Sequence, residues 1–328
     1  DYAIKWTDFE DDSFHQAIEG SRAIIIDSKV YDLYADRFPA IKNKQHIFKV
    51  EVKEETKTPH LSLEICDFLL NSGFKRNHTL LAIGGGVIQD LSTFAASILF
   101  RGIKWIFVPT TLLAQADSCI GGKSSLNIGK WKNQIGNFYP PHEIFIISDF
   151  LKTLEDVDIR SGVGEIIKVH YLSGIDMASD MIAAMDSIFE DSQILDDAIH
   201  GALLYKAKII KEDEFDKGVR LKFNYGHTFG HALEAASNFA LPHGLAVTIG
   251  MDCANYVALK QGLISEGDYL KMQIAILKNL RPEDKAQVDL DIFFDALRHD
   301  KKNTETEYGF ILPTEVGEVA KIFVPMTE

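Results

Sequence analysis

The first half of the chain alternates short apolar runs with stretches of helical periodicity, and this alternation limits its possible folds more than any other feature. The runs are rich in β-branched residues and lie at 22–26, 46–50, 79–83, 104–108 and 144–147. Segments between them, such as 61–71 and 91–100, repeat apolar residues at helical spacing. Strands that alternate with helices pair in parallel and carry helices on both faces of the sheet. The pattern therefore predicts a Rossmann-like parallel α/β domain.

The pattern changes after about residue 149, where long helical periods replace the alternation. The expected helices are 158–172, 176–189, 194–213, 225–238, 244–262 and 266–278, and the expected late strands are 307–312 and 319–324. We therefore expect a nucleotide-binding α/β domain over 1–148 and a mostly helical domain over 149–328. No internal repeat is visible in the sequence.

Composition excludes several classes of protein. With 328 residues, 46 % of them apolar, the chain can bury two cores and is not disordered. No stretch approaches the roughly 20 apolar residues of a membrane span. A net charge of −14 argues against a nucleic-acid or anionic-lipid surface, and three widely spaced cysteines suggest neither a disulfide framework nor a zinc knuckle. No signal peptide is recognisable, so we expect a cytoplasmic protein.

A glycine triplet follows the third strand-like run and precedes a helical stretch. At Gly84, Gly85 and Gly86, backbone N–H groups can approach an anion closely, with the helix dipole behind them. Asp27 ends the first run, where an acidic residue can take ribose hydroxyls. Gln89 stands where the G-x-G-x-x-G fingerprint has its third glycine, so a plain tight turn remains the alternative.

A group of histidines and acidic residues suggests a metal site. His227 and His231 are four residues apart and share one helical face, and His243 follows at the start of the next helical stretch. Glu165 and Lys168, three apart, share a face upstream. Two imidazoles and a carboxylate make a typical zinc site with an open position for substrate. Structural histidines are the alternative, and the spacing does not fit the H-E-x-x-H motif of zinc proteases.

Several basic residues lie in polar or glycine-rich segments rather than on amphipathic faces. In a chain of charge −14, such a set favours a phosphorylated or carboxylated small substrate, with solvated surface charges as the alternative. The set comprises Arg101, Lys123, Lys132, Lys206 and Arg220, with Lys301 and Lys302 as further candidates.

At this point the motifs GGGVIQD, DSCIGGKSSLN, GVGEIIK, NYGHTFGHALE, LPHG and HDKKN resemble those of the 3-dehydroquinate synthases and the wider sugar-phosphate cyclase family. The resemblance extends from about residue 22 to 324. It implies a lyase-type cyclisation of 3-deoxy-arabino-heptulosonate 7-phosphate to 3-dehydroquinate with release of phosphate. Bound NAD is reduced and then reoxidised within one turnover, so the overall reaction involves no net oxidation. The pathway implied is the shikimate route of aromatic amino acid biosynthesis.

The resemblance also implies roles for individual residues. The NAD contacts would be Asp27, Glu54, Lys57, Gly85, Gly86, Asp90, Thr110, Thr111 and Thr153, with Lys132 nearby. A divalent metal, zinc or cobalt, would bind to Glu165, His227 and His243. The substrate residues would be Asp117, Lys123, Asn133, Lys168, Lys206, Arg220, Asn224 and His231, with a lysine from 301–302, here taken as Lys302. Arg101 would reach the phosphate site of a neighbouring subunit in a homodimer. These roles make the first domain NAD-binding and the second metal- and substrate-binding.

Some positions depart from the family pattern, namely Gln89, Trp131, Val169-His170 and Leu245. They bear on the substrate rather than on the class of reaction. The alternatives are another sugar-phosphate cyclase, a metal-dependent alcohol or glycerol dehydrogenase, and a non-enzymatic scaffold. The first would use sedoheptulose 7-phosphate, glucose 6-phosphate or an amino analogue. Arg220 and Asn224 resemble the synthase pattern and favour a substrate with a carboxylate. The DSCIGGKSSLN segment argues against the dehydrogenase.

Overall fold

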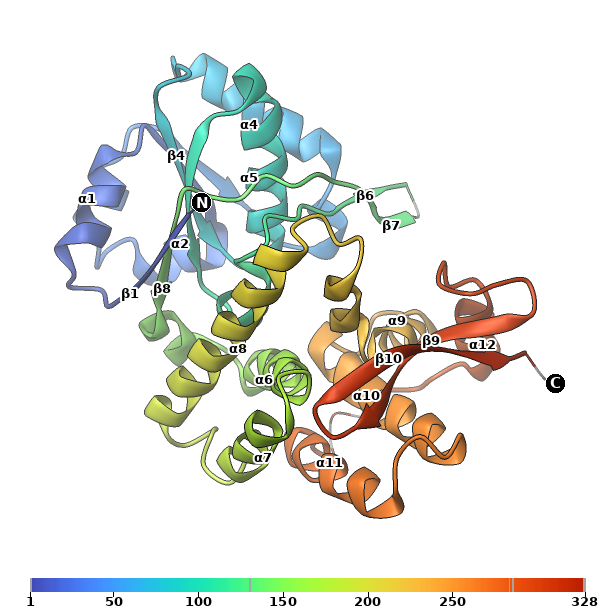
Figure 1. The fold of residues 1–328 in the computed structure, drawn as a ribbon. Helices are drawn as coiled ribbons and strands as arrows, with labels where there is room; N and C mark the ends of the chain where they lie inside the picture. The colour runs from blue at the N-terminus through green and yellow to red at the C-terminus, as the bar shows by residue number, and fades with distance from the viewer. Residues whose placement is uncertain (1, 130, 283, 285, 327–328) are drawn as a thin grey trace. The chain divides into compact units, whose positions relative to one another are not determined.

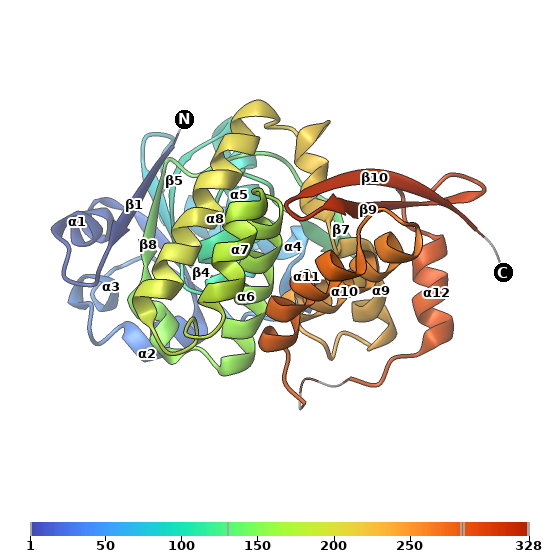
Figure 2. The same cartoon turned by 60° about the horizontal axis from the view of Figure 1, so that its bottom comes forward.

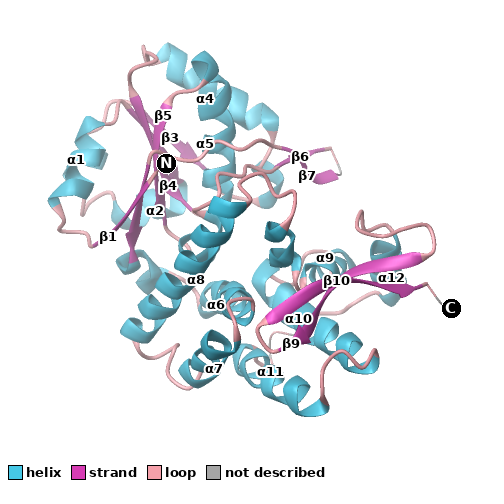
Figure 3. Ribbon diagram, viewed as in Figure 1, coloured by secondary structure: helices cyan, strands magenta, loops and turns pink. Residues whose placement is uncertain are grey.

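The computed structural model describes residues 2–129, 131–282, 284 and 286–326. The chain divides into two compact units, Asp1–Leu154 and Glu155–Glu328 (Figure 1). The secondary structure of the two units differs as the sequence pattern predicts: a parallel sheet with helices in the first and mostly helices in the second (Figure 3). The predicted α/β fold class is confirmed.

The first unit is built on a six-stranded sheet in the order β1-β8-β5-β4-β2-β3, and all neighbouring strands in it pair in parallel. The strands are β1 (Ala3–Thr7), β2 (Ala23–Asp27), β3 (Ile47–Val50), β4 (Thr79–Gly84), β5 (Lys104–Pro109) and β8 (Glu143–Ile147). All five predicted strands are present. The edge strand β1 was missed because its residues are only partly buried and its sequence, AIKWT, mixes polar and apolar residues without a long run.

Helices and one hairpin complete the first unit. They are α1 (Asp12–Gly20), α2 (Ser28–Tyr34), α3 (Pro39–Lys42), η1 (Glu54–Thr56), α4 (Pro59–Asn71), α5 (Gly86–Ile98), η2 (Leu99–Arg101), η3 (Ala114–Ser118), η4 (Ser148–Thr153), and the antiparallel pair β6 (Leu126–Ile128) and β7 (Trp131–Ile135). The hairpin was not predicted, since its polar sequence carries no strand-like apolar run. Helix α5 begins five residues before the predicted 91–100, directly at Gly86.

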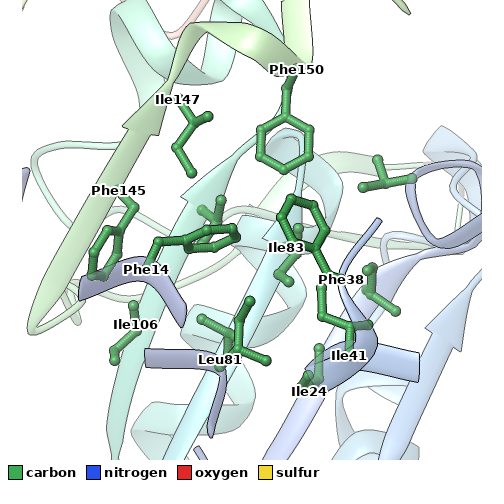
Figure 4. Close-up of a cluster of buried hydrophobic side chains, with 14 of the residues drawn as sticks. Phe14, Ile24, Phe38, Ile41, Leu81, Ile83, Ile106, Phe145, Ile147 and Phe150 are labelled. Atoms are coloured by element: carbon green, nitrogen blue, oxygen red, sulfur yellow. The ribbon is translucent and has the colours of Figure 1, made fainter. Parts of the chain in front are cut away.

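An aromatic cluster packs the short N-terminal helices against one face of the sheet (Figure 4). The ring of Phe9 lies 4.7 Å from that of Phe150 and 5.0 Å from that of Phe38, both in edge-to-face geometry. Phe14 and Phe145 are also fully buried. Each such ring contributes about 1.5–3 kcal/mol through burial. The cluster therefore fixes the N-terminal helices on the sheet and stabilises the positions of the strand ends.

The order of the strands reverses between β2 and β4. From β2 the chain steps outward to β3, whereas from β4 it steps the other way through β5 to β8. In open α/β sheets, ligands bind beyond the carboxyl ends of the strands at this switch point. Asp27 ends β2 and Gly84 ends β4, so both sequence signals of a nucleotide site lie at this point.

The second unit is mostly helical. Its elements are α6 (Asp156–Tyr171), α7 (Ile175–Ala184), α8 (Ser192–Glu212), η5 (Val219–Asn224), α9 (His227–Ala236), α10 (His243–Lys260), α11 (Glu266–Asn279), α12 (Leu290–Arg298), and the hairpin β9 (Glu307–Glu315) and β10 (Glu318–Pro325). Helix α10 packs against α6, α9 and α11, and β9 also contacts α10 (Figure 2). Every predicted helix and both late strands are present, while α12 was not predicted. None of the described helices is long and apolar enough to cross a membrane.

Candidate functional site

The glycine triplet forms the turn from β4 into α5, and its three members meet different surroundings. A Cβ on Gly84 would overlap the Ile88 side chain, and one on Gly85 would lie 2.9 Å from Cγ2 of Thr111. A Cβ on Gly86, the first residue of α5, would meet no described heavy atom within 4 Å. The first two glycines are therefore required by packing. At the third, the backbone is open to an incoming ligand at a helix N-terminus.

Three further predicted nucleotide contacts have clear places in the fold. Asp27 caps α2 by accepting a hydrogen bond from the Lys29 amide at 2.8 Å, and burial raises the pKa of its carboxyl. Thr110 donates its amide to the Gly84 carbonyl at 3.0 Å, and Thr111 packs on Gly85. Both threonines therefore lie at the glycine turn. Thr153 lies elsewhere, at the end of η4, where its hydroxyl is 2.8 Å from that of Tyr34.

A charged network centred on Lys57 brings this residue together with four others. The Lys57 ammonium lies 3.2 Å from Asp90 Oδ2 and 3.6 Å from Glu54 Oε1, and it donates to Asn133 Oδ1 at 2.9 Å. Asn127 was not predicted. Its side chain donates to Glu54 Oε1 at 2.9 Å and accepts the Asn133 amide at 2.9 Å. Burial raises the pKa of Asp90 to about 6, against the opposing effect of Lys57. The sequence could have identified Asn127, because it is the last residue of the DSCIGGKSSLN motif.

The remaining candidates of the first unit lie on three segments. Asp117 is part of η3, and the neighbouring Ser118 exchanges two hydrogen bonds with the buried Gln89, of 2.5 and 2.6 Å. Lys123 and Asn133 line one cavity of about 240 Å³ beside the β6–β7 hairpin, which also carries Lys132. Arg101 ends η2, is exposed and adopts a left-handed backbone conformation with φ of 62°.

A larger cavity of about 560 Å³ lies at the opposite, amino ends of β2, β3 and β4. Its cations already bind carbonyl groups at helix ends. Lys44 donates to Ile18 and Glu19, and Arg22 donates to the Ser72 carbonyl. We therefore assign this cavity a structural rather than a catalytic role.

In the second unit, α6, α9 and α10 bring Glu165, His227 and His243 together. Nε2 of His227 lies 3.8 Å and Nε2 of His243 3.5 Å from Glu165 Oε1, and one donor atom from each residue falls within 4.8 Å of the others. Glu165 is only 1 % exposed, and its Oε1 has no hydrogen-bond partner among the described residues. Unpaired buried carboxylate oxygens are costly, and a cation would satisfy this one. The three side chains thus fit a divalent metal such as zinc.

Glycines beside these residues allow their helices to approach. A Cβ on Gly244 would overlap the Ser161 carbonyl of α6, and one on Gly164 would overlap the Gly244 carbonyl of α10. At the start of α9, Gly226 has φ of 76° and precedes His227, which explains why the helix begins two residues later than predicted. The motifs G-E, G-H and H-G therefore combine a ligand with the small residue that lets its helix come close.

Electrostatics favour cation binding at this cluster. Burial would raise the pKa of Glu165, but Lys168, His243 and His227 outweigh burial and hold that pKa well below its ordinary range. Burial and the Lys168 charge lower the pKa of His227, so its imidazole is neutral at neutral pH. Burial would lower the pKa of His243, but the Glu165 and Glu234 carboxylates beside its two ring nitrogens outweigh burial and raise that pKa to about 10. A metal at this position would replace that proton.

Two buried lysines accompany the cluster. Lys168 forms a buried ion pair with Glu165 on the same face of α6, as their spacing predicts. Lys206 of α8 is also buried, and the ammonium groups of Lys168 and Lys206 lie 5.9 and 5.6 Å from the ring of Phe223. Phe223 was not predicted to take part. Its ring provides a cation–π contact for both lysines.

The other predicted substrate residues of the second unit lie on η5, on α9 and in the segment after α12. Arg220 is buried in η5 and donates Nη1 to the Glu214 carbonyl at 2.7 Å, and Asn224 ends the same element. The ring of His231 lies 5.3 Å from that of His227 and 5.8 Å from that of His243. Lys302 pairs with Asp300 at 2.7 Å, and both charges act on the pKa of His231, whereas Lys301 is exposed. Of the two lysines, Lys302 is therefore the one whose charge acts on His231.

Comparisons with known proteins place both halves of the chain in one family. The models of the 3-dehydroquinate synthase N-terminal and C-terminal domains match residues 47–161 and 162–303. The 3-dehydroquinate synthase of Campylobacter fetus is 36 % identical over 315 residues, which cover 95 % of this chain and 90 % of that protein. That of Clostridium tetani is 38 % identical over 297 residues, 89 % of this chain and 79 % of that protein.

A solved structure has the same fold as this chain. The crystal structure of 2-deoxy-scyllo-inosose synthase with carbaglucose-6-phosphate, NAD⁺ and Co²⁺ has a TM-score of 0.87 to this chain, with 27 % identity. The match covers 98 % of this chain and 93 % of that one. The resemblance found in the motifs is thereby confirmed, and an alcohol dehydrogenase or a non-enzymatic scaffold is disfavoured.

Proposed function

The chain belongs to the 3-dehydroquinate synthase family, and on that premise we propose that it converts 3-deoxy-arabino-heptulosonate 7-phosphate to 3-dehydroquinate with release of phosphate. The observation that carries the proposal is the cluster of Glu165, His227 and His243 beside the buried Lys168. It combines a site for a Lewis acid with a cation for an anionic substrate, which a phosphate-eliminating cyclase requires.

NAD is the proposed cofactor of the first unit, Asp1–Leu154. The open backbone at Gly86 would take the pyrophosphate, Asp27 a ribose, and Thr110 and Thr111 would line the same turn. The network of Glu54, Lys57 and Asp90 would hold the remainder of the cofactor, with Lys132 and Thr153 as further contacts. When bound, NAD supplies a reversible hydride acceptor. The chain's residues keep it in place so that it can be regenerated in each turnover.

The proposed metal, zinc or cobalt, would bind to Glu165, His227 and His243 of the second unit, Glu155–Glu328. When bound, such a metal polarises an alcohol or ketone oxygen of the substrate. Lys168 and Lys206 would bind anionic groups of the substrate, and their burial strengthens each interaction. Arg220 offers a planar fork that suits a carboxylate, and the hydroxyl groups would bind to Asn224, His231 and Lys302. By resemblance to the family, Asp117, Lys123 and Asn133 are also proposed as substrate contacts.

The proposed assembly is a homodimer in which Arg101 reaches the phosphate of a neighbouring subunit. The exposure of Arg101 supports this proposal. The reaction would belong to the shikimate pathway of aromatic amino acid biosynthesis, carried out in the cytoplasm.

One assay tests the function. Phosphate release is measured with NAD, zinc or cobalt, and each candidate sugar phosphate in turn, while absorbance is followed at 340 nm, the band of reduced nicotinamide. We expect phosphate release with 3-deoxy-arabino-heptulosonate 7-phosphate and no net change at 340 nm. Preferred turnover of glucose 6-phosphate, whose carba-analogue is bound in the 2-deoxy-scyllo-inosose synthase structure, would point to another cyclase. Steady accumulation of NADH in step with product would point to a dehydrogenase.

A further inference from the structure

A second carboxylate, that of Glu234, contacts the histidine cluster at the ring nitrogen of His243 that does not face Glu165. Glu234 lies on α9, three residues after His231 and seven after His227, so all three share one face of the helix. Its Oε1 is 3.3 Å from Nδ1 of His243. The Glu234 side chain is 18 % exposed, so water competes little for this contact. Glu234 ends the motif GHALE, but residue spacing alone assigned it no role.

The two nitrogens of the His243 ring therefore face two different carboxylates. Nδ1 faces Glu234 and Nε2 faces Glu165 at 3.5 Å. An imidazole that donates one N–H to a carboxylate presents the lone pair of its other nitrogen, and the hydrogen bond also fixes the plane of the ring. His243 needs such support because it is the first residue of α10, where Pro242 precedes it, and its side chain is 36 % exposed.

We propose that Glu234 is a positioning residue, which holds His243 with Nδ1 protonated and turns Nε2 toward Glu165 for a divalent metal. The inference rests on the metal site of the proposed function, but not on the identity of the substrate. Carboxylates in this position raise the basicity of a histidine ligand, and their loss typically lowers metal affinity about 10- to 100-fold.

One other arrangement of the same atoms is possible. Donor atoms of His231, Glu234 and His243 also lie within 4.8 Å of one another, so Glu234 could itself bind a metal. That group differs in one respect from the first. Glu165 Oε1 is buried and has no hydrogen-bond partner among the residues described, whereas Glu234 already has His243 as its partner. The cost of leaving Glu165 unsatisfied favours a metal at Glu165 and a hydrogen-bonding role for Glu234.

Metal titration without substrate tests the inference. The full-length enzyme is stripped with a chelator, and the Kd for Zn²⁺ is measured by competition with a chromophoric chelator. The visible absorption of bound Co²⁺ reports the ligand set. The variants are Glu234→Ala, Glu234→Gln, which keeps a neutral acceptor for the Nδ1–H, and His227→Ala, which removes a ligand. Glu266→Gln removes an exposed carboxylate at the start of α11 and serves as the matched control.

We expect Glu234→Ala to weaken zinc binding 10- to 100-fold, Glu234→Gln to weaken it less, and Glu266→Gln to leave it unchanged. One ion should still bind per chain in both Glu234 variants, with the Co²⁺ spectrum retained at saturation, while His227→Ala should lose stoichiometric binding. An unchanged Kd in a folded Glu234→Ala variant would overturn the inference. A changed Co²⁺ spectrum in Glu234→Gln would make Glu234 a ligand and overturn it as well. Because no substrate is present, failure of the cyclase assay with these affinities intact would refute the proposed function alone.

Discussion

The two units position their candidate site residues by different means. In the first unit, the nucleotide end is made by backbone: a glycine turn, a helix N-terminus and the switch point of a parallel sheet. In the second, the metal cluster is made by side chains from three helices, among them Glu165, His227 and His243. Many hydrogen bonds of the sheet together keep these backbone groups in position. The side-chain cluster, in contrast, loses part of its binding site when any one of its members is replaced.

This difference predicts where a single substitution should be most harmful. Removing one side chain from the helical cluster deletes a ligand or leaves a buried charge without its partner, which costs several kcal/mol. Substitutions at the glycine turn leave the backbone donors in place and act only through added volume. The predictions below test this comparison.

Loss of a metal ligand should have the largest effect. His227→Ala should lose bound metal and at least about 10³-fold in kcat/KM, about 4 kcal/mol of transition-state stabilisation. His227 suits the test better than Glu165, because Glu165→Ala would also leave Lys168 buried without its ion-pair partner. Metal content after gel filtration and phosphate release are the two measurements.

His200→Ala, at an exposed position of α8, controls for the loss of a histidine. A His227→Ala protein that retains one metal ion per chain would show that the ligand assignment is wrong.

Arg220→Lys should have the next largest effect, because lysine keeps the charge but not the planar fork of arginine. We expect a loss of about 2–5 kcal/mol in kcat/KM with 3-deoxy-arabino-heptulosonate 7-phosphate, and little turnover of sedoheptulose 7-phosphate by the wild type. Arg298→Lys, exposed on α12, is the matched control. A wild-type preference for sedoheptulose 7-phosphate would show that the proposed substrate is wrong, while the assignment to the cyclase class would stand.

The contrast between the units also explains what the sequence could predict. The apolar strand runs and long helical periods were sufficient for the sheet and for the helices of the second unit. The hairpin β6–β7 and the edge strand β1 were missed, because they carry few buried residues and their pairing is set by tertiary contacts. Helix α12 was missed although its sequence, LDIFFDALR, is amphipathic at helical spacing.

Among the site residues, motifs identified side chains but not their contacts. The i, i+4 spacing placed His227 and His231 on one face, and the structure adds His243 and Glu165 from other helices. Asn127, Phe223 and Glu234 were missed, because each acts by touching a candidate that lies far away in the sequence or on another helix. Such partners follow from packing, which residue spacing does not encode.

Asp90 tests whether the first unit is as independent of side chains as its glycine turn suggests. The pKa of Asp90 in the folded protein, about 6, lies above the ordinary value of 3.8, because burial disfavours the carboxylate. Between these values the folded chain holds more protons than the unfolded chain, so this group makes folding less favourable as the pH rises. Its contribution should decline by up to about 3 kcal/mol from pH 4 to 7.

Denaturant unfolding at several pH values measures this effect as the free energy of unfolding of the wild type minus that of Asp90→Asn. We expect the difference to fall as the pH rises through about 6. Asp67→Asn, at an exposed position on α4, is the matched control. A difference that rises with pH would mean that Lys57 outweighs burial and that the network stabilises the carboxylate.

The smallest effect should come from Gly86→Ala, and it separates folding from binding. No described atom lies within 4 Å of the added Cβ, and Gly86 is not among the positive-φ residues, so alanine at this first position of α5 should leave the Tm unchanged or slightly higher. If the backbone at Gly86 receives the pyrophosphate, the methyl group should raise the Kd for NAD about tenfold, a cost of about 1.4 kcal/mol.

Two further glycine variants separate binding from folding. Gly20→Ala, which also meets no atom within 4 Å, is the control for volume and helix propensity. Gly84→Ala should lower the Tm, because its Cβ overlaps Ile88. Calorimetric titration with NAD and thermal unfolding of the three variants measure both quantities. Unchanged NAD affinity in Gly86→Ala would place the pyrophosphate away from this turn.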